Sequence, residues 1–209
     1  MASFASDPTP SSPSLRGADP LVDVARLAAA GDLAATARLL RAVGPRLTGA
    51  VRAVLGPAHP DLDDAVQQSL IALVQALPAF RGECSPASYG ARIAVRIAVA
   101  TRRMGRLRAL RRDEMASREP PPMPIATPGD DDTSERRRRL LRELLSEIPE
   151  EQAEAMALRV VLGWSLEEVS EATGAPTNTV RSRLRLAREA LRKRIEADPR
   201  LADELEVSP

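Results

Sequence analysis

The sequence predicts an all-α fold, and three observations support this prediction. Aromatic residues are only 2% of the 209 residues, so a core of leucine, valine, isoleucine and alanine is expected, which suits packed helices better than a β-sandwich. Apolar residues recur at helical spacing along most of the chain. The pattern S-x-x-E at Ser165 and Glu168 is typical of a helix start. We expect two helical domains joined by a flexible linker rich in proline and aspartate, the second containing a helix-turn-helix.

The first domain is predicted for residues 18–115, after a tail. Residues 1–17 are rich in serine and proline, which is typical of disorder, and they lack the apolar centre of a signal peptide. Helical spacing runs from Pro20 to Gly56, with a kink or break expected at Gly44-Pro45 because proline removes a helical hydrogen bond. No apolar run approaches the length of a membrane span.

Two more helices complete the first domain. Pro60 and Pro78 bracket one helix, and the next is expected to begin with Ser85 as its cap and Pro86 at its first position. The buried stripe of this last helix is expected at Ile93, Ile97, Ala100, Met104 and Leu107. From Thr101 to Arg112 the chain has six arginines and no acid. Such a run repels itself unless a partner neutralises it, which favours nucleic acid over a solvated helix end.

The second domain is predicted for residues 135–196. It follows a linker at 116–134 whose five prolines and three aspartates cannot build a core. Residues 197–209 form an acidic tail. The two halves share a helical style but no sequence repeat.

The second domain contains the clearest local motif of the chain. Ser165 and Glu168 predict a capping box, and Trp164 and Val169 predict the hydrophobic staple that accompanies it. Gly174 is expected to end this helix, because the left-handed conformation found there is accessible to glycine without strain.

A second helix follows after a tight turn, with Thr177 as its expected cap. Its apolar stripe is flanked by arginines at the same spacing, and polar side chains occupy its first turns. Short polar side chains and arginines at the start of a helix suit base edges and phosphates. A solvated helix face is the alternative, but the capping box, turn glycine and polar start together favour a helix-turn-helix that enters the DNA major groove.

Composition argues against several functional classes. Cys84 is the only cysteine and His59 the only histidine. An internal disulfide is therefore excluded, and a zinc site or a Cys/His nucleophile pair is not expected. No acid/base constellation is visible either. We expect a cytoplasmic protein that is not an enzyme, holds no cofactor or metal and does not contact a membrane.

The order of these parts resembles the extracytoplasmic-function (ECF) class of bacterial RNA polymerase sigma factors. The segment IPEEQAEAMALRVVLGWSLEEVSEATGAPTNTVRSRLRLAREALRKRI is similar to the promoter-reading C-terminal domain of that family. LDDAVQQSLIALVQALPAFRGECSPASYGARIAVRIAVATRR is similar to its core-binding and promoter-melting segment, and VARLAAAGDLAATARLLRAVGPRLTGAVRAVLG to its opening helices. The resemblance implies a sigma factor that binds core RNA polymerase, at the β′ clamp helices and the β flap, and directs promoter-specific initiation.

The resemblance also implies roles for individual residues. Those expected to dock on the clamp helices are Asp63, Asp64, Gln67 and Gln68. Those expected to recognise the minus-ten element are Phe80, Arg81, Tyr89, Arg92, Arg96, Arg102 and Arg103, with Tyr89 where the family usually has tryptophan. Those expected to read the minus-thirty-five element are Thr177, Asn178, Thr179, Arg181, Ser182 and Arg185. Promoter DNA is thus a partner, and an anti-sigma protein is another that the resemblance allows for.

The residues themselves also allow two other functions. One is a stand-alone helix-turn-helix regulator whose N-terminal half senses a ligand or dimerises, which would require an apolar pocket within residues 62–112. The other is a degenerate sigma-like interaction protein that occupies a partner, an idea kept by the scarcity of aromatic side chains for stacking on bases.

Overall fold

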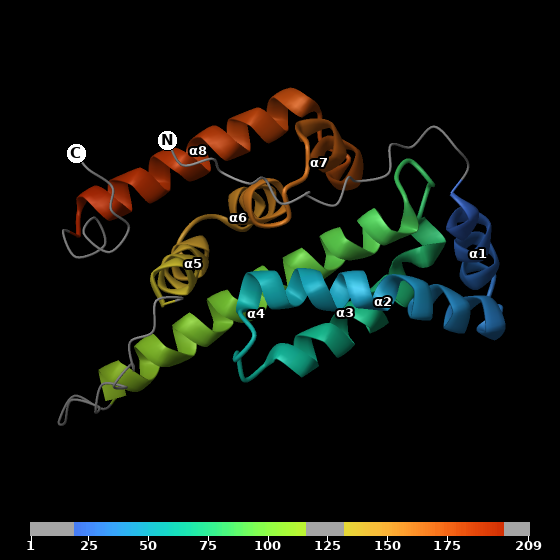
Figure 1. Cartoon of the computed structure of the whole chain (residues 1–209), viewed down its shortest axis with the longest axis horizontal. Coiled ribbons are helices and arrows are strands. Elements are labelled where there is room, and N and C mark those ends of the chain that lie inside the picture. The colour runs from blue at the N-terminus through green and yellow to red at the C-terminus, as the bar shows by residue number, and fades with distance from the viewer. Residues whose placement is uncertain (1–18, 116–131, 199–209) are drawn as a thin grey trace, which may run out of the picture.

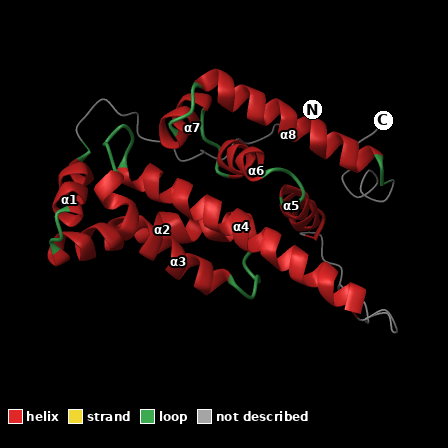
Figure 2. Cartoon of the chain, turned by 180° about the vertical axis from the view of Figure 1, so that it is seen from behind, coloured by secondary structure: helices red, strands yellow, loops and turns green. Residues whose placement is uncertain are grey.

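The computed structural model describes residues 19–115 and 132–198, and every regular element in these ranges is a helix (Figures 1 and 2). The helices are α1 (Pro20–Ala29), α2 (Leu33–Leu55), α3 (Leu62–Ala76), α4 (Pro86–Met115), α5 (Asp132–Leu145), α6 (Glu150–Met156), α7 (Leu166–Thr173) and α8 (Thr177–Glu196), with a 3₁₀ turn at Leu77–Ala79 and a π-helical turn at Ala157–Val161. The predicted all-α fold is confirmed for these residues. The predicted tail at 1–17 and most of the predicted linker and acidic tail lie outside them.

Side-chain caps define where the first helices begin. Asp19 accepts a hydrogen bond from the Leu21 amide at 2.9 Å, and Asp32 accepts one from the Ala35 amide at 3.0 Å. The predicted cap of α4 is confirmed, because Ser85 Oγ accepts from the Ser88 amide at 3.0 Å. Each cap satisfies a backbone donor that the helix itself leaves unpaired.

A kink or a break is predicted at Gly44-Pro45, and the chain does not break there, because α2 continues through Pro45. A proline inside a helix costs about 3 kcal/mol. Burial on both sides of the proline offsets this cost, since Leu39, Val43, Leu47 and Val51 are all fully buried. One continuous apolar face therefore overrides the local signal.

The buried stripe predicted for α4 is wrong. Met104 and Leu107 are 48% and 40% exposed, Ala100 is exposed and Ile93 and Ile97 are only half-buried. The residues that are buried are small, namely Ala91, Ala94, Val95, Ala98 and Val99. The reason is that α4 is a central helix, packed by α2 and α3 and also by α6 and α7. Small side chains let these backbones approach, and the bulkier ones lie at the rim.

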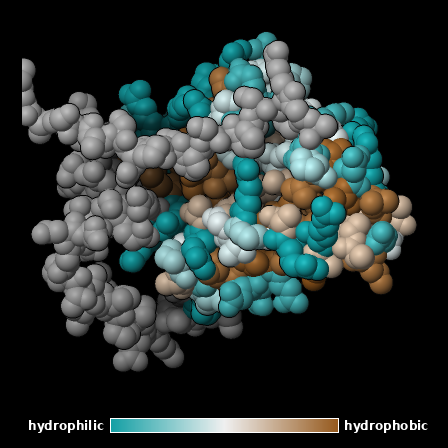
Figure 3. Space-filling view, turned by 45° about the vertical axis from the view of Figure 1, so that its right-hand side comes forward, coloured by the Kyte–Doolittle hydropathy of each residue, from teal (hydrophilic) through white to brown (hydrophobic). Residues whose placement is uncertain are grey.

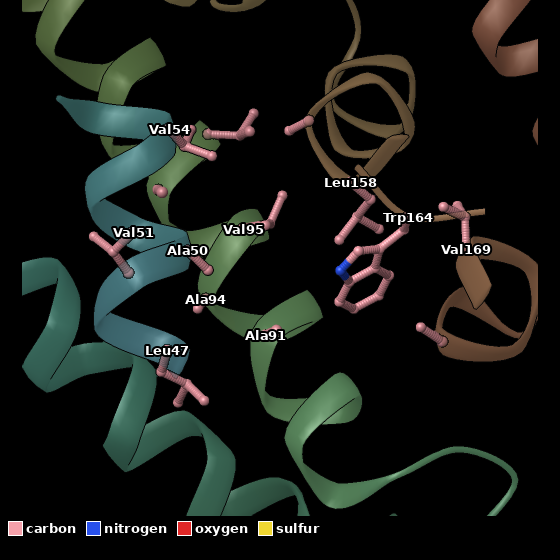
Figure 4. Close-up of a cluster of buried hydrophobic side chains, with 14 of the residues drawn as sticks. Leu47, Ala50, Val51, Val54, Ala91, Ala94, Val95, Leu158, Trp164 and Val169 are labelled. Carbon is pink, nitrogen blue, oxygen red and sulfur yellow. The ribbon is translucent and has the colours of Figure 1, made fainter. Parts of the chain in front are cut away.

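The two predicted domains share one continuous core. Helices α6 and α7 pack on α4, and the buried cluster extends from Leu47 and Val54 to Leu158 and Trp164. Figure 4 shows the Trp164 ring beside Leu158 of its own half and directed toward the helix that carries Ala91. Helix α6 lies between α4 and α8 (Figure 1). The C-terminal half therefore rests on the helix that the resemblance assigns to the minus-ten element.

Candidate nucleic-acid interface

The start of the helix-turn-helix is built as predicted. The Glu168 amide donates to Ser165 Oγ at 3.1 Å, and the Ser165 amide donates to Glu168 Oε2 at 2.7 Å, which completes the capping box. Trp164 and Val169 are both buried on either side of this cap. Gly174 ends α7 with φ of 64°, in the left-handed region. These local contacts fix the angle at which the chain enters and leaves α7.

The predicted cap of α8 is wrong. Thr177 is the first residue of the helix, Pro176 occupies the cap position, and no side chain caps this end. Pro176 has a ψ of 144°, so the chain is still extended there, and the helix begins at Thr177, one residue earlier than a threonine cap would place it. The Thr177 hydroxyl donates instead to Ser170 Oγ at 3.4 Å, which ties the start of α8 to α7.

Helix α8 separates a buried face from an exposed face. Of the apolar stripe predicted for this helix, Val180, Leu184 and Ala187 are buried, whereas Leu191 and Ile195 near its end are only half-buried. The predicted reading residues Asn178, Thr179, Arg181, Ser182 and Arg185 are all exposed, and Thr177 is half-buried. Arg181 donates to Asn178 Oδ1 at 3.0 Å, and Arg185 lies 3.6 Å from Glu189 of the same helix. The structure thus gathers the predicted reading residues on the first turns of one solvent-facing helix.

Four of the seven predicted minus-ten residues line a cleft between the loop before α4 and the end of α7. The cleft has a volume of about 170 Å³ and is lined by Phe80, Arg81, Tyr89 and Arg92 on one side and by residues 171–174 on the other. The rings of Phe80 and Tyr89 are 5.1 Å apart and tilted by 47°. The Tyr89 hydroxyl also donates to the carbonyl of Ala76 at 3.4 Å. The two aromatic side chains of this region are therefore neighbours in space.

The arginines predicted on α4 fall into different environments. Arg92 pairs with Glu154 at 2.9 Å and Arg96 with Glu150 at 3.8 Å, so both meet acids of α6. Arg103 is exposed. These acidic partners were not predicted from the sequence. The one available signal was that Glu150 and Glu154 are four residues apart, as are Arg92 and Arg96.

Arg102 has a structural role that sequence reasoning missed. Its guanidinium donates to the carbonyl of Leu55 at 2.8 Å, at the C-terminal end of α2. Arg142 of α5 donates to the neighbouring Ala53 carbonyl at 3.1 Å. Burial lowers the pKa of the Arg102 guanidinium, and the nearby Glu143 opposes that shift. Both arginines satisfy carbonyls that end a helix, where positive charge is favoured.

The residues predicted to dock on the polymerase lie together on α3. Asp63, Asp64, Gln67 and Gln68 are all exposed. A groove of about 320 Å³ runs beside them and is lined by Asp61, Asp64, Ala65, Gln68, Ile97, Ala100, Thr101, Met104 and Arg108. This groove also receives Met104 of the mispredicted stripe, so an exposed apolar surface adjoins the acidic and amide side chains.

Cys84, the remaining candidate group, is a buried thiol. Burial raises the pKa of the Cys84 thiol to about 11, and Glu171 adds to the shift. A thiol of this kind is a poor nucleophile near neutral pH.

Within residues 19–115 and 132–198, no cluster of three or more potential metal ligands exists, and no helix has the length and apolar character to cross a membrane. Hydrophilic residues surround several hydrophobic patches on the face drawn in Figure 3.

Comparison with known proteins gives concordant matches to both halves of the chain. The family model "Sigma-70 region 2" matches residues 39–108, and "Sigma-70, region 4" matches residues 138–191. The chain is 32% identical over 163 residues to the ECF RNA polymerase sigma factor SigD of Mycobacterium tuberculosis, covering 74% of each chain. It is 29% identical over 147 residues to the ECF RNA polymerase sigma-E factor of Haemophilus influenzae, covering 65% of this chain and 75% of that one.

A solved structure also resembles the fold. It is the structure of CnrH in complex with the cytosolic domain of CnrY, which superposes with a TM-score of 0.50 at 22% sequence identity and covers 86% of this chain and 99% of that chain. At this identity the likeness shows the fold alone.

Proposed function

The chain belongs to the ECF class of RNA polymerase sigma factors and so directs transcription initiation, and we propose that it does so through three surfaces of its own. The exposed acids and amides of α3 hold core RNA polymerase. The loop before α4, together with α4, captures the minus-ten element. The first turns of α8 read the minus-thirty-five element in the major groove.

The geometry of α8 carries this proposal. A recognition helix needs one face anchored to its own domain and the opposite face free for base edges and phosphates. Val180, Leu184 and Ala187 anchor α8, while Asn178 and Arg185 lie on the free face. Arginine suits guanine edges and phosphates, and asparagine suits adenine.

The minus-ten assignment is supported by the neighbouring aromatic rings and arginines. A base leaves the stack only where a pocket and a stacking partner repay a few kcal/mol. Phe80 and Tyr89 supply the stacking surface, and Arg81, Arg92, Arg96 and Arg103 supply positive charge for the backbone of the strand.

Two reading domains on one chain gain specificity through effective concentration. We assign residues 18–115 to the first domain, 116–134 to the connecting segment and 135–196 to the second.

Because its partner would be the transcribing polymerase, the protein would work in the cytoplasm. An anti-sigma protein is a further proposed partner. The relatives' names favour this function over a stand-alone regulator.

The direct test is run-off transcription with core polymerase and the full chain. We expect Arg185→Ala to weaken use of the upstream promoter element about tenfold, the size of one good base contact of 1–3 kcal/mol. Arg188→Ala is the matched control, since Arg188 is exposed on the same helix outside the predicted reading set. Equal activity of the Arg185 variant and the wild type would contradict the assignment of α8.

Core binding is tested separately by pull-down of polymerase. Asp64→Ala with Gln68→Ala should weaken capture, because both side chains border the groove beside α3. Gln75→Ala is the control, because Gln75 is exposed near the other end of the same helix. Undiminished capture by the double variant would place the polymerase contact elsewhere.

A further inference from the structure

Three acids of the C-terminal half lie against three arginines of α4. Glu154 pairs with Arg92 at 2.9 Å, Glu150 pairs with Arg96 at 3.8 Å, and Glu147 pairs with Arg106. The acids, hereafter the acidic row, are Glu147, Glu150 and Glu154. The first pair is the most enclosed, since the side chains of Arg92 and Glu154 are 24% and 6% exposed. Two of the arginines are predicted minus-ten residues.

The pairing is ordered along the helices. As the acids ascend in number from Glu147 to Glu154, their partners descend from Arg106 to Arg92. Glu150 and Glu154 are four residues apart in α6 and share one face of that helix, and Glu147 lies in the turn before it. Three separate ion pairs, each joining an acid of the C-terminal half to an arginine of α4, distinguish a matched surface from an isolated contact.

The same segment also neutralises arginines of α8. Glu151 pairs with Arg183 at 2.6 Å, and Glu147 pairs with Arg194 at 2.9 Å. Helix α6 and the turn before it therefore lie between two cationic helices and supply acids to both. Figure 1 shows α6 in this position between α4 and α8.

An apolar contact lies beside the acidic row. Trp164 is 4% exposed, and the Arg46 guanidinium of α2 lies 5.8 Å from the centre of its ring. Leu158 is fully buried in the same cluster as Val95 of α4. Exposed ion pairs contribute little to stability, so apolar burial supplies most of the attraction between the halves. The acidic row sets the register and matches the charge.

We infer that the C-terminal half is a built-in cover for the minus-ten surface, with the acidic row standing where promoter phosphates would otherwise bind. This rests on the proposed function. In the closed arrangement described here, Arg92 and Arg96 are occupied by carboxylates, and residues 171–174 wall the cleft that holds Phe80 and Tyr89. Single-stranded DNA must displace the cover, so the free chain binds the minus-ten strand weakly.

Two residues of the natural sequence can report whether the C-terminal half has moved away from α4, so no added fluorescent label is needed. Trp164 is the only tryptophan and lies at the contact between the halves, so its fluorescence reports whether the contact is closed. Cys84 is the only cysteine, is 5% exposed and lines the same cleft as residues 171–174. Opening should expose both side chains while leaving each half folded.

The test variant carries both Glu150→Lys and Glu154→Lys. It is compared with a control double variant that has the same change in net charge. The control is Asp23→Lys with Glu167→Lys, since Asp23 and Glu167 are exposed and lie outside the contact. Reversed charges facing Arg92 and Arg96 should open the cover. We expect Trp164 emission to shift to longer wavelength, with several-fold stronger iodide quenching and faster alkylation of Cys84, at unchanged helicity by circular dichroism.

The DNA measurement uses a short fluorescein-labelled poly(dT) strand and fluorescence anisotropy with the full chain. The open variant should bind this strand about tenfold more tightly than the control, because both carry the same net charge and only one has lost the cover. The neutral variant Glu150→Gln with Glu154→Gln should fall between them. It also guards against a lysine that simply prevents folding.

Unchanged quenching and alkylation in the lysine and glutamine variants would overturn the cover, whatever the result of run-off transcription. Opening without a gain in DNA binding over the control would equally overturn it, because the acids would then not compete with phosphates. The fluorescence measurement needs neither polymerase nor promoter, so failure of the cover is distinguishable from failure of the proposed function.

Discussion

Arg92 of α4 and Arg185 of α8 both belong to rows of arginines at helical spacing, but their surroundings are opposite. The Arg92 side chain is 24% exposed and bound to an acid of another helix, whereas the Arg185 side chain is 70% exposed and meets only an acid of its own helix among the contacts described. Arg192 is likewise paired within α8, with Glu196 at 2.6 Å. The first turns of α8 are therefore open to solvent, whereas the part of α4 that carries Arg92 is covered by α6.

A cationic helix face is therefore not by itself a nucleic-acid surface. The two faces are alike in residue type, and their availability depends on which acids the rest of the chain brings to them. A row of arginines beside a matched row of acids is stabilised inside the molecule, while a row that faces solvent keeps its charge for a partner.

The comparison is tested most strongly by removing one arginine from each helix. Arg92→Ala should lower the free energy of unfolding by about 1–3 kcal/mol, because Glu154 is 4% exposed and would keep a buried charge without its partner. Arg185→Ala should change it by less than about 0.5 kcal/mol, as is usual for an exposed side chain. Urea unfolding followed by circular dichroism measures both. Similar losses from the two variants would remove the distinction between the helices.

A second test uses two glycines of α4. A Cβ added at Gly90 would lie 2.8 Å from Leu47 Cδ1, whereas one at Gly105 would meet nothing within 4 Å. Gly90→Ala should therefore destabilise the protein by about 1–2 kcal/mol through overpacking. Gly105→Ala should stabilise it by up to about 1 kcal/mol through helix propensity. Thermal unfolding of the pair separates the packed start of α4 from its open end, and the same sign for both would contradict this.

A third test compares the two helices of the helix-turn-helix. Ser165→Ala removes the hydroxyl that accepts from the Glu168 amide in the capping box and should cost about 1 kcal/mol. Thr177→Ala should cost less than about 0.5 kcal/mol, because α8 has no side-chain cap. Denaturant midpoints of the two variants decide between a helix stabilised by its cap and a helix stabilised by packing. A larger loss at Thr177 would show that its contact with Ser170 matters more than we expect.

The smallest effect expected is on the pH dependence of the free energy of unfolding, through His59, which lies near Arg102 of α4. Burial lowers the pKa of His59 below 6.5, and the charge of Arg102 lowers it further. The unfolded chain then binds the proton first, so stability is fully present above pH 6.5 and falls as the pH drops through the lowered pKa. His59→Gln should flatten this part of the profile in urea unfolding at successive pH values. An unchanged slope would mean that His59 is not the group responsible.

The elements that sequence analysis predicted well are those determined by neighbouring residues. The capping box, the Gly174 turn and the stripe of α8 depend on contacts within a few positions, so their patterns are visible in the sequence. The prediction for α4 was wrong, because large apolar residues were assumed to be buried. A helix enclosed on several sides instead buries its small residues, and only its neighbours reveal this.

The helices, the helix-turn-helix and the family were all predictable from the order of the amino acids. Which arginines are covered, which of them support the end of α2 and where Trp164 lies depend on how the helices pack. The pair of Arg92 and Glu154 joins positions 62 residues apart, and no local pattern relates them. Helix formation depends on hydrogen bonds between near neighbours, whereas the availability of a charge depends on which distant acid the packed core brings beside it.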